Sequence, residues 1–354
     1  MKIAVLFDGP AALGKGADLA ILLTVEEVEN ALVPHGNQVV RVPVNPDGRW
    51  VERVRRGKFD LIFNLCEAVD GVAELEPSVI SAIEVIGLPY TGSSSWVTSL
   101  CLRKHVINSV LDRAGLPIPR FAVVHPGEPM PHVGYPAIVK PAAEDASIGV
   151  EQRSVVRNAR QLAERVMAMH ERWDEVLVQK YVDGREVNVG IIGDETLPVA
   201  EILFDGMPRG MWRIVSYRSK WETGCDEDLG SVPRCPAKLE KGQAEELKRI
   251  AVRAWKVAGG EGYGRIDLRI DRNGKPWILE VNSNPDFAPD AGLARMGRTA
   301  GYSYGDMVHM ICAAALKRSR RSAEEQWLVA RSLSGVPATP AEVAAALDLF
   351  VAQG

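Results

Sequence analysis

Hydrophobic and polar positions alternate along the first part of the chain in two recurring patterns. Short apolar runs at residues 3–7, 38–42 and 61–65 are separated by stretches with helical spacing, such as residues 19–32 and 76–86. Short apolar runs are typical of buried strands, and their alternation with helices predicts a parallel sheet covered by helices. We expect this first domain to span residues 1–97.

The pattern changes beyond this boundary. A helix is expected near residues 98–114, because Gly115 and Pro117 follow it. Two further domains are expected over residues 98–181 and 182–318, and the strands that define them are 121–124, 137–140, 176–180, 187–192, 197–203, 263–270 and 276–281. Their helices are expected at 159–171, 243–258 and 304–316. Thr339-Pro340 is typical of a helix start, so residues 319–354 are expected to form a helical extension.

The most regular polar pattern lies on two strands that flank Asn273-Gly274, a pair typical of a two-residue type I′ hairpin turn. With that turn, Asp267 faces Glu280 and Arg265 faces Asn282. Side chains alternate between the faces of a strand, so these four polar residues share one face. The other face is expected to be apolar and to consist of Ile266, Leu268, Ile270, Trp277, Leu279 and Val281.

The polar face combines oxygen ligands with a guanidinium. Mg²⁺ binds carboxylate and phosphate oxygens, so Asp267, Glu280 and Asn282 form a candidate metal site. Arg265 can stabilise a phosphate or a developing oxyanion. A solvated hairpin surface of mixed charge is the alternative on this pattern alone. Two directly opposed acids are unfavourable without a cation, which favours the metal.

Composition narrows the class of protein. The 354 residues carry 46% hydrophobic and 25% charged side chains with a formal net charge of −4, which is typical of a soluble protein of two or three domains. Nothing here predicts a nucleic-acid or membrane partner. The apolar run at the N-terminus is too short for a signal peptide or a membrane span. The five cysteines include no C-x-x-C pair, which disfavours disulfide and zinc frameworks and predicts a cytoplasmic protein.

A glycine-rich segment follows the first predicted strand. Its spacing from Gly9 through Gly14 and Lys15 nearly matches a P-loop, but Gly16 replaces the hydroxyl residue that would bind Mg²⁺. The P-loop interpretation is therefore disfavoured. The ordinary interpretation is a turn into the first helix, which can also bind a substrate anion at the helix N-terminus.

Several segments occur in a fixed order around the hairpin. They are FNLCEAVDG, GLPYTGSS followed by Lys104, YPAIVKPAAEDASIGV, VLVQKYVDGREVNVGIIGD, YRSKWETG and GYGRIDLRIDRNGKPWILEVNSNPD. Over residues 61–316 this set resembles the ATP-grasp enzymes of the D-alanine–D-alanine ligase type. The resemblance implies a three-domain α/β (α+β) fold, with an N-terminal Rossmann-like parallel sheet and ATP held between two antiparallel sheets.

The resemblance also implies roles for individual residues. The phosphate contacts would be Lys104, Lys140, Ser147 and Lys220. The adenine-binding hinge would be Gln179, Lys180, Tyr181 and Val182, and the ribose contact would be Glu186. Asp267, Glu280 and Asn282 would hold two Mg²⁺, which Mn²⁺ can replace, while Arg265 would form the oxyanion hole. Arg265 and Lys220 would be the catalytic residues, and residues 142–149 and 217–230 the candidate lids.

The implied activity is that of an ADP-forming carboxylate–amine ligase. It would pass through an acyl phosphate and join amino acids or related small molecules by an amide bond, although a hydroxyl or thiol nucleophile stays open. Three residues stand where the family has other substrate-binding groups: Glu67, Asp290 and Gly292. We therefore expect small-molecule substrates other than two D-alanines. D-alanine–D-alanine ligase activity and a non-catalytic ATP-binding relative are the alternatives, and the family suggests a homodimer.

Overall fold

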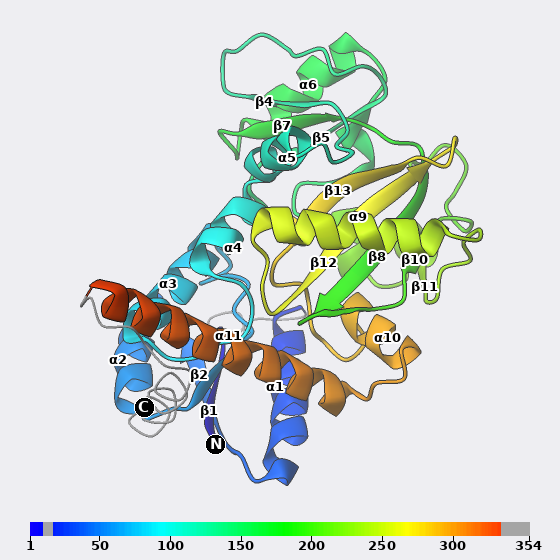
Figure 1. Cartoon of the computed structure of the whole chain (residues 1–354). Helices are drawn as coiled ribbons and strands as arrows, with labels where there is room; N and C mark the ends of the chain where they lie inside the picture. Colours follow the sequence, from blue (N-terminus) through cyan, green and yellow to red (C-terminus); the bar gives the residue numbers. More distant parts are fainter. Residues whose placement is uncertain (10–16, 334–354) are drawn as a thin grey trace.

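The computed structural model describes residues 1–9 and 17–333 of the chain (Figure 1). Most of the glycine-rich segment after Gly9 and the predicted helix start at Thr339 lie outside these residues. Within them, no helix is long and apolar enough to cross a membrane. The described chain forms three sheets with helices packed on them, which confirms the predicted α/β class.

The first sheet is parallel and has the strand order β2-β1-β3. Its strands are β1 (Lys2–Asp8), β2 (Gln38–Val44) and β3 (Leu61–Asn64). The helices that follow them are α1 (Ala17–Leu32), α2 (Arg49–Arg56) and α3 (Glu76–Ile86). Single-turn 3₁₀ helices occur at η2 (Val33–His35), η3 (Ala73–Leu75) and η4 (Gln152–Ser154). The alternation of apolar runs and helical stretches therefore predicted this sheet correctly.

The second sheet is antiparallel with the order β4-β7-β5-β6. Its elements are β4 (Phe121–Val124), β5 (Ala137–Pro141), β6 (Val155–Val156), β7 (Val176–Lys180) and the helix α6 (Ala159–Met169). The single helix predicted before it is in fact two, α4 (Ser95–Leu102) and α5 (Lys104–Arg113). They meet at Arg103, whose ψ of 85° is not helical. Lys104 thus begins a new helix, and its N–H donates to the carbonyl of Ala142 at 2.9 Å.

The third sheet is antiparallel with the order β11-β10-β8-β12-β13, and β9 also pairs with β8. Its strands are β8 (Gly184–Ile192), β9 (Glu195–Thr196), β10 (Ala200–Leu203), β11 (Val232–Arg234), β12 (Tyr263–Asp271) and β13 (Pro276–Asn282). The remaining helices are α7 (Tyr217–Trp221), α8 (Asp226–Leu229), α9 (Gln243–Ala258), α10 (Gly292–Thr299) and α11 (Tyr304–Leu333). Helix α9 lies across one face of this sheet (Figure 1) and shares a buried core with it.

The β12–β13 hairpin departs from the predicted turn but keeps the predicted polar pairs. The loop has three residues, since Asp271 N–H donates to the carbonyl of Lys275 and Gly274 has a φ of 82°. This loop shifts the register by one residue, so Leu268 pairs with Ile278. A bulge then restores the register, and Asp267 faces Glu280 as predicted.

The shift corrects the predicted apolar face. Ile278 is fully buried in the core beneath α9, whereas Trp277 and Leu279 are only partly buried. Leu279 instead faces the other side of the sheet, where it lines a cavity between the second and third sheets. The predicted face was wrong at these two positions because the alternation of side chains breaks at a bulge.

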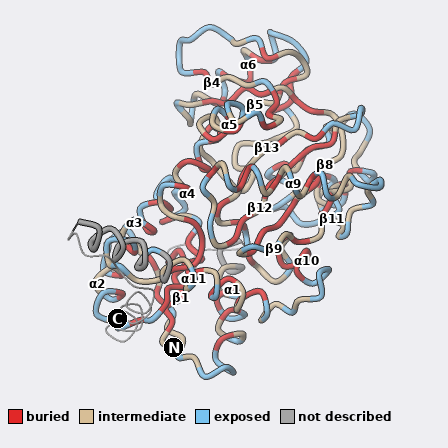
Figure 2. The backbone as a smooth tube through the Cα atoms, in the orientation of Figure 1, coloured by how far each residue is buried: buried red, intermediate tan, exposed pale blue. Residues whose placement is uncertain are grey.

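Helices α10 and α11 pack against the end of the third sheet that lies next to the first sheet. Met307, Val308 and Ile311 of α11 lie in one core with Ile3 and Val5 of β1, and the strand β1 is buried along most of its length (Figure 2). The helix covers the first sheet together with α1, and it runs without a break to Leu333.

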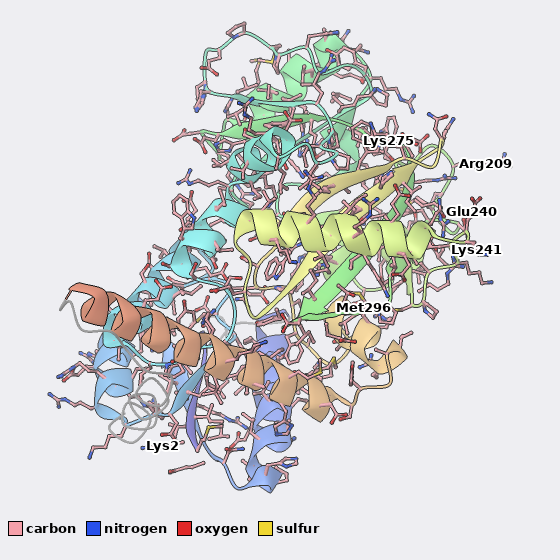
Figure 3. All side chains as sticks on the ribbon, viewed as in Figure 1. Lys2, Arg209, Glu240, Lys241, Lys275 and Met296 are labelled. Carbon is pink, nitrogen blue, oxygen red and sulfur yellow. The ribbon has the colours of Figure 1, made fainter. Side chains whose placement is uncertain are left out.

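The approach of α10 to the sheet depends on a glycine. A Cβ at Gly190 of β8 would lie 2.7 Å from Leu293 and 3.4 Å from Met296 of α10, which is at the lower end of the sheet in Figure 3. Lys275 marks the opposite end, at the hairpin tip (Figure 3). Close packing at Gly190 therefore brings the start of α10, at Gly292, to the cavity.

Candidate active site

A cavity of about 550 Å³ lies between the second and third sheets. Both sheets contribute to its walls, together with the loops near residues 144–150 and 214–233. The predicted site residues that line it are Lys104, Lys140, Ser147, Gln179, Lys180, Tyr181, Val182, Glu186, Lys220, Arg265, Asp267, Glu280, Asn282, Asp290 and Gly292. Among the predicted residues, Glu67 is not part of this lining. Positions far apart in the sequence thus meet around one space.

Asp267 lies at the centre of a dense set of hydrogen bonds. Arg265 donates to both of its oxygens, from Nε at 2.7 Å and from Nη2 at 2.9 Å. Asn282 donates to Oδ2 at 3.0 Å, and Asn188 of β8 donates to Oδ1 at 2.6 Å. The Nη1 nitrogen of Arg265 makes no hydrogen bond to any described residue, so it remains available for a ligand.

Glu280 faces a second group of cations. The Nζ atom of Lys104 lies 2.5 Å from its Oε1 and 3.1 Å from Oδ1 of Asp145. Burial alone would raise the pKa of Glu280, but Lys104 and Lys140 outweigh it and hold this pKa well below its usual range. Burial lowers the pKa of Lys140, which Glu280 opposes. Glu280 is therefore an ionised carboxylate at neutral pH.

These residues fit Mg²⁺ bound together with phosphates. No group of three or more His, Cys, Asp and Glu side chains in residues 1–9 and 17–333 could hold a metal by itself. The cavity offers two carboxylates, Asp267 and Glu280, and the amide of Asn282. Mg²⁺ commonly uses one or two carboxylates and completes its shell with water and substrate phosphates, so this set suffices only when a phosphate is present.

The predicted hinge lines the cavity at the end of β7. The side chain of Lys180 donates to the carbonyl of Tyr135 at 2.5 Å, and the hydroxyl of Tyr181 donates to the carbonyl of Arg213 at 3.2 Å. These side chains are therefore occupied by protein contacts. Gln179 differs, because it is 1% exposed and its Nε2 has no partner among the described residues. A buried donor without a partner is costly, and a ligand acceptor in the cavity would satisfy it.

The two predicted lid loops contact one another. Ala146 and Ser147 both have positive φ angles, 53° and 61°, so they form a sharp turn. The Ser147 hydroxyl donates to the carbonyl of Val215 at 3.0 Å, and the Trp221 indole donates to the carbonyl of Ala146 at 3.2 Å. Lys220, next to Trp221 on α7, lines the cavity.

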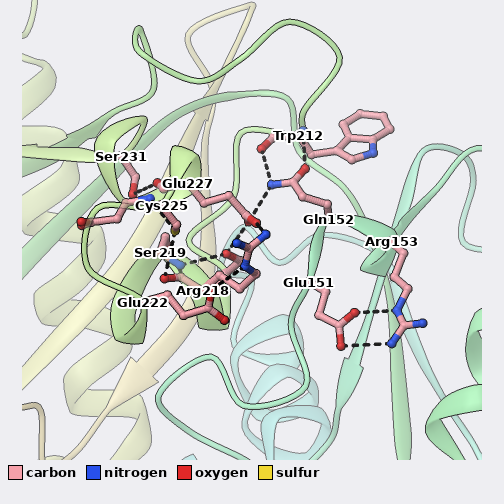
Figure 4. A network of polar contacts seen from close by, with 12 residues as sticks. Glu151, Gln152, Arg153, Trp212, Arg218, Ser219, Glu222, Cys225, Glu227 and Ser231 are labelled. Carbon is pink, nitrogen blue, oxygen red and sulfur yellow. Dashed lines mark hydrogen bonds and ion pairs between the residues drawn. The ribbon is translucent and has the colours of Figure 1, made fainter. Parts of the chain in front are cut away.

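A polar network around the buried Glu227 joins these loops (Figure 4). Glu227 is 3% exposed and accepts hydrogen bonds from Ser216 at 2.5 Å and from Gln152 at 3.1 Å. Gln152 also accepts from the N–H of Trp212 at 2.6 Å, and Arg218 lies 3.5 Å from Glu227. The network ties the loop that carries Lys220 to the segment after Ser147. Sequence patterns did not indicate it.

The predicted substrate residues occupy two places beside the cavity. Gly292 is the first residue of α10, and Asp290 precedes it in an exposed position. Glu67 still reaches solvent, but the surrounding protein removes much of the water around its carboxyl. This loss of solvation raises the pKa of the carboxyl to about 8. Asp286 and Asp145 add to this rise, and Lys220 and Arg265 oppose it. Glu67 thus belongs to the electrostatic surroundings of the cavity.

A second glutamate near Glu67 went unnoticed in the sequence. Glu76, at the start of α3, is 4% exposed and accepts a hydrogen bond from Asn284 at 2.9 Å. Asn284 in turn accepts from the hydroxyl of Tyr263 at 2.5 Å. Burial raises the pKa of Glu76 well above its usual range, with Asp145 adding to the rise. Glu76 therefore links the first domain to the end of β13.

Arg269 and Asn188 were also missed, although the sequence contained a signal for both. Alternation along β12 places Arg269 on the face of Arg265 and Asp267, and alternation along β8 places Asn188 with Glu186. All of them line the cavity. The prediction stopped at the residues of the hairpin and did not extend the same rule to these positions.

Comparison with known proteins agrees with this geometry. A family model described as the D-Ala–D-Ala ligase C-terminus matches residues 110–313, more than half of the chain. The D-alanine–D-alanine ligase of Parvibaculum lavamentivorans is 31% identical over 287 residues, which cover 78% of this chain and 87% of that protein. The chain belongs to the D-alanine–D-alanine ligase-like family of ATP-grasp enzymes. The predicted ADP-forming carboxylate–amine ligase class, with ATP as its nucleotide, is thereby confirmed.

Two further proteins are similar to this chain. Protein y4sG of Sinorhizobium fredii is 29% identical over 260 residues, which cover 73% of this chain and 75% of that protein. The crystal structure of D-alanine–D-alanine ligase from Bacillus anthracis complexed with ATP superposes with a TM-score of 0.73 at 20% identity. The superposition covers 91% of this chain and 99% of that one. This likeness confirms the predicted ATP-grasp fold.

The buried Glu76 predicts how the stability of this ATP-grasp ligase depends on pH. Its folded pKa exceeds the ordinary value, so the folded state binds an extra proton above about pH 4.5, and stability falls as pH rises. Glu76→Gln keeps an acceptor for Asn284 without the charge. We expect the variant to gain stability relative to the unchanged protein between pH 5 and pH 8, by up to about 1.4 kcal/mol per pH unit.

Urea unfolding midpoints of the two proteins at pH 5 and pH 8 measure this difference. The exposed Glu74→Gln variant is the control, and it should follow the unchanged protein at both values. A Glu76→Gln variant that loses stability equally at both pH values would contradict the assignment.

Proposed function

We propose that this enzyme activates a small carboxylic acid with Mg·ATP as an acyl phosphate and passes the acyl group to an amine. The observation that carries the proposal is the convergence of two carboxylates, Asp267 and Glu280, with three cations in one cavity. These cations are Arg265, Lys104 and Lys140. Such a set binds phosphates and the metal that accompanies them.

In the first step, an oxygen of the substrate carboxylate attacks the γ-phosphorus of ATP. The bond to the bridging oxygen breaks, and ADP leaves. In the second step, the amine nitrogen attacks the acyl carbon, the C–N bond forms, and inorganic phosphate leaves with the bonding electrons while the nitrogen loses a proton. Activation is needed because a free carboxylate would have to expel oxide, a far worse leaving group.

The residues of the cavity divide this work. Asp267, Glu280 and Asn282 would hold one or two Mg²⁺ ions, which Mn²⁺ can replace. The bound ions would neutralise the charge of the phosphates. Lys104, Lys140 and Lys220 would bind phosphate oxygens. The free Nη1 of Arg265 would donate to the oxyanion of the tetrahedral intermediate.

The joined loops would protect the intermediate from water. An acyl phosphate hydrolyses readily, so catalysis requires a closed cavity while it exists. Contacts between the segment of Ala146 and Ser147 and the segment of Trp221 supply that closure. The buried Glu227 network would hold Lys220 in place as the loops close.

The substrate pocket would lie between Glu67 and the start of α10. An ionised Glu67 would bind a substrate ammonium group, and Asp290 and Gly292 would contact the second substrate. D-Alanine is the substrate that the names of several relatives suggest, but the changed residues favour another pair of small molecules. A cytoplasmic location, supported by five free cysteines, and a homodimer belong to the same proposal.

Release of ADP and phosphate with paired substrates tests the proposed reaction. We expect product formation from at least one pair in a matrix of D- and L-amino acids, with a product mass equal to the two substrates minus water. Wells with ATP alone are the control, and product formation with D-alanine as the only substrate would favour D-alanine–D-alanine ligase activity. Tight ATP binding without ADP release for any acid and amine would favour a non-catalytic relative.

Glu280→Gln tests the metal assignment. Loss of the charge removes one Mg²⁺ ligand, so we expect ADP formation to fall about 100-fold or more and to require more Mg²⁺. The control is Glu195→Gln, an exposed change on the same sheet, which should leave both unaltered. Near-normal ADP formation with normal Mg²⁺ dependence in Glu280→Gln would overturn the assignment.

Glu67→Gln tests recognition of the ammonium group. The raised pKa keeps much of Glu67 protonated at neutral pH, so kcat/KM should rise with pH through about 8 as the carboxylate forms. In Glu67→Gln we expect that rise to vanish and kcat/KM at pH 9 to fall about tenfold or more. Glu74→Gln should keep the full profile. A Glu67→Gln profile identical to that of the unchanged enzyme would exclude this role.

A further inference from the structure

Arg269 lies on the cavity face of β12 and is 3% exposed. A strand rises about 3.4 Å per residue, so Arg269 lies roughly 14 Å along the strand from Arg265. Arg265 stands beside the metal and phosphate candidates. Arg269 therefore stands at the other end of the cavity, where the nucleoside of a bound ATP would lie.

The guanidinium of Arg269 holds separate segments of the cavity wall together. Its Nε and Nη2 donate to Oε2 of Glu186 at 3.2 and 2.8 Å, and its Nη1 donates to the carbonyl of Val182 at 2.7 Å. Nη2 also donates to the carbonyl of Arg213. The ring of Tyr181 faces the guanidinium at 5.0 Å. One side chain thus fixes the hinge, β8 and the loop before α7.

Arg269 binds only one of the two carboxylate oxygens of Glu186. Both bonds from Arg269 go to Oε2, and Oε1 accepts no hydrogen bond from residues 1–9 or 17–333. Glu186 lines the cavity. The charge of Arg269 is permanent, and a buried cation is strongly destabilised without its acidic partner. Arg269 therefore restricts the Glu186 side chain and leaves one carboxylate oxygen for a ligand hydroxyl.

We propose that Arg269 is a positioning residue that orients Glu186 toward the ribose hydroxyls, and so makes the enzyme selective for ribonucleoside over deoxyribonucleoside triphosphates. The inference rests on the proposed binding of ATP in this cavity. A carboxylate held in one orientation binds a ligand tightly only if a hydroxyl lies at the matching position. A mobile carboxylate can bind water instead when that hydroxyl is missing.

A purely structural role predicts a different result. If Arg269 only stabilised the sheet, its loss would weaken the binding of ATP and of deoxyATP to the same extent. If it orients Glu186, its loss would weaken ATP binding and leave deoxyATP binding nearly unchanged. The ratio of the two affinities separates these cases.

Calorimetric titration of the full chain with ATP, 2′-deoxyATP and 3′-deoxyATP, each with Mg²⁺, measures the ratio. We expect the unchanged protein to bind ATP about tenfold or more tightly than at least one deoxy analogue. Arg269→Met should reduce this preference to that of Glu186→Gln. Arg185→Met is the matched control, because Arg185 lies on β8, pairs with Glu201 at 2.6 Å and is not part of the cavity lining.

The outcomes are distinct. A full preference for ATP in Arg269→Met, together with its loss in Glu186→Gln, overturns the inference, as does equal weakening of all three nucleotides. No binding of ATP to the unchanged protein refutes the proposed function instead. If Arg269→Met does not fold by thermal melting, Arg269→Lys decides: we expect a reduced preference, since one ammonium cannot reproduce the planar set of bonds, and an unaltered preference overturns the proposal.

Discussion

Charge neutralisation between β12, β13 and α5 is the constraint on which the rest of the cavity depends. Asp267 and Glu280 face each other and are only partly exposed, so an unpaired carboxylate is costly there. Arg265 pairs with the first, and Lys104 with the second. In the proposed function, Lys104 would also bind a phosphate, and Arg265 would stabilise the oxyanion of the tetrahedral intermediate. Asp267, Glu280 and Asn282 would hold the Mg²⁺ that accompanies ATP, and its charge would balance Glu280 when Lys104 binds a phosphate oxygen.

Three separate devices keep these charges in place. The break at Arg103 starts a helix at Lys104 and directs it into the cavity. The network around Glu227 ties the segment after Ser147 to the loop that carries Lys220. At the other end of the cavity, Arg269 holds Glu186 and the backbone of Val182. Arg269 and Glu227 are buried and act through hydrogen bonds, which restrict the side chains that they join.

The alternation of residues was enough to predict the central pairs of the hairpin, although the predicted two-residue turn was wrong. The three-residue loop after Asp271 shifts the register by one, and the bulge beyond Asp267 shifts it back. A two-residue turn with no bulge predicts the same pairs at Glu280 and Asn282. It fails only in the stretch between the loop and the bulge, which includes Trp277 and Leu279. Loop length and bulges depend on local hydrogen bonds that a pattern of residue types does not specify.

The sequence by itself determined the parallel first sheet, the polar face of the hairpin and the ligase family, because periodicity and ordered motifs are local properties of the chain. Only the tertiary structure decided that Glu76 bonds to Asn284, that Glu227 joins two loops, and that α11 completes the core of the first sheet. Glu76 and Asn284 are 208 residues apart. Periodicity tells which side of an element is buried, but the partner of that side depends on how the whole chain packs.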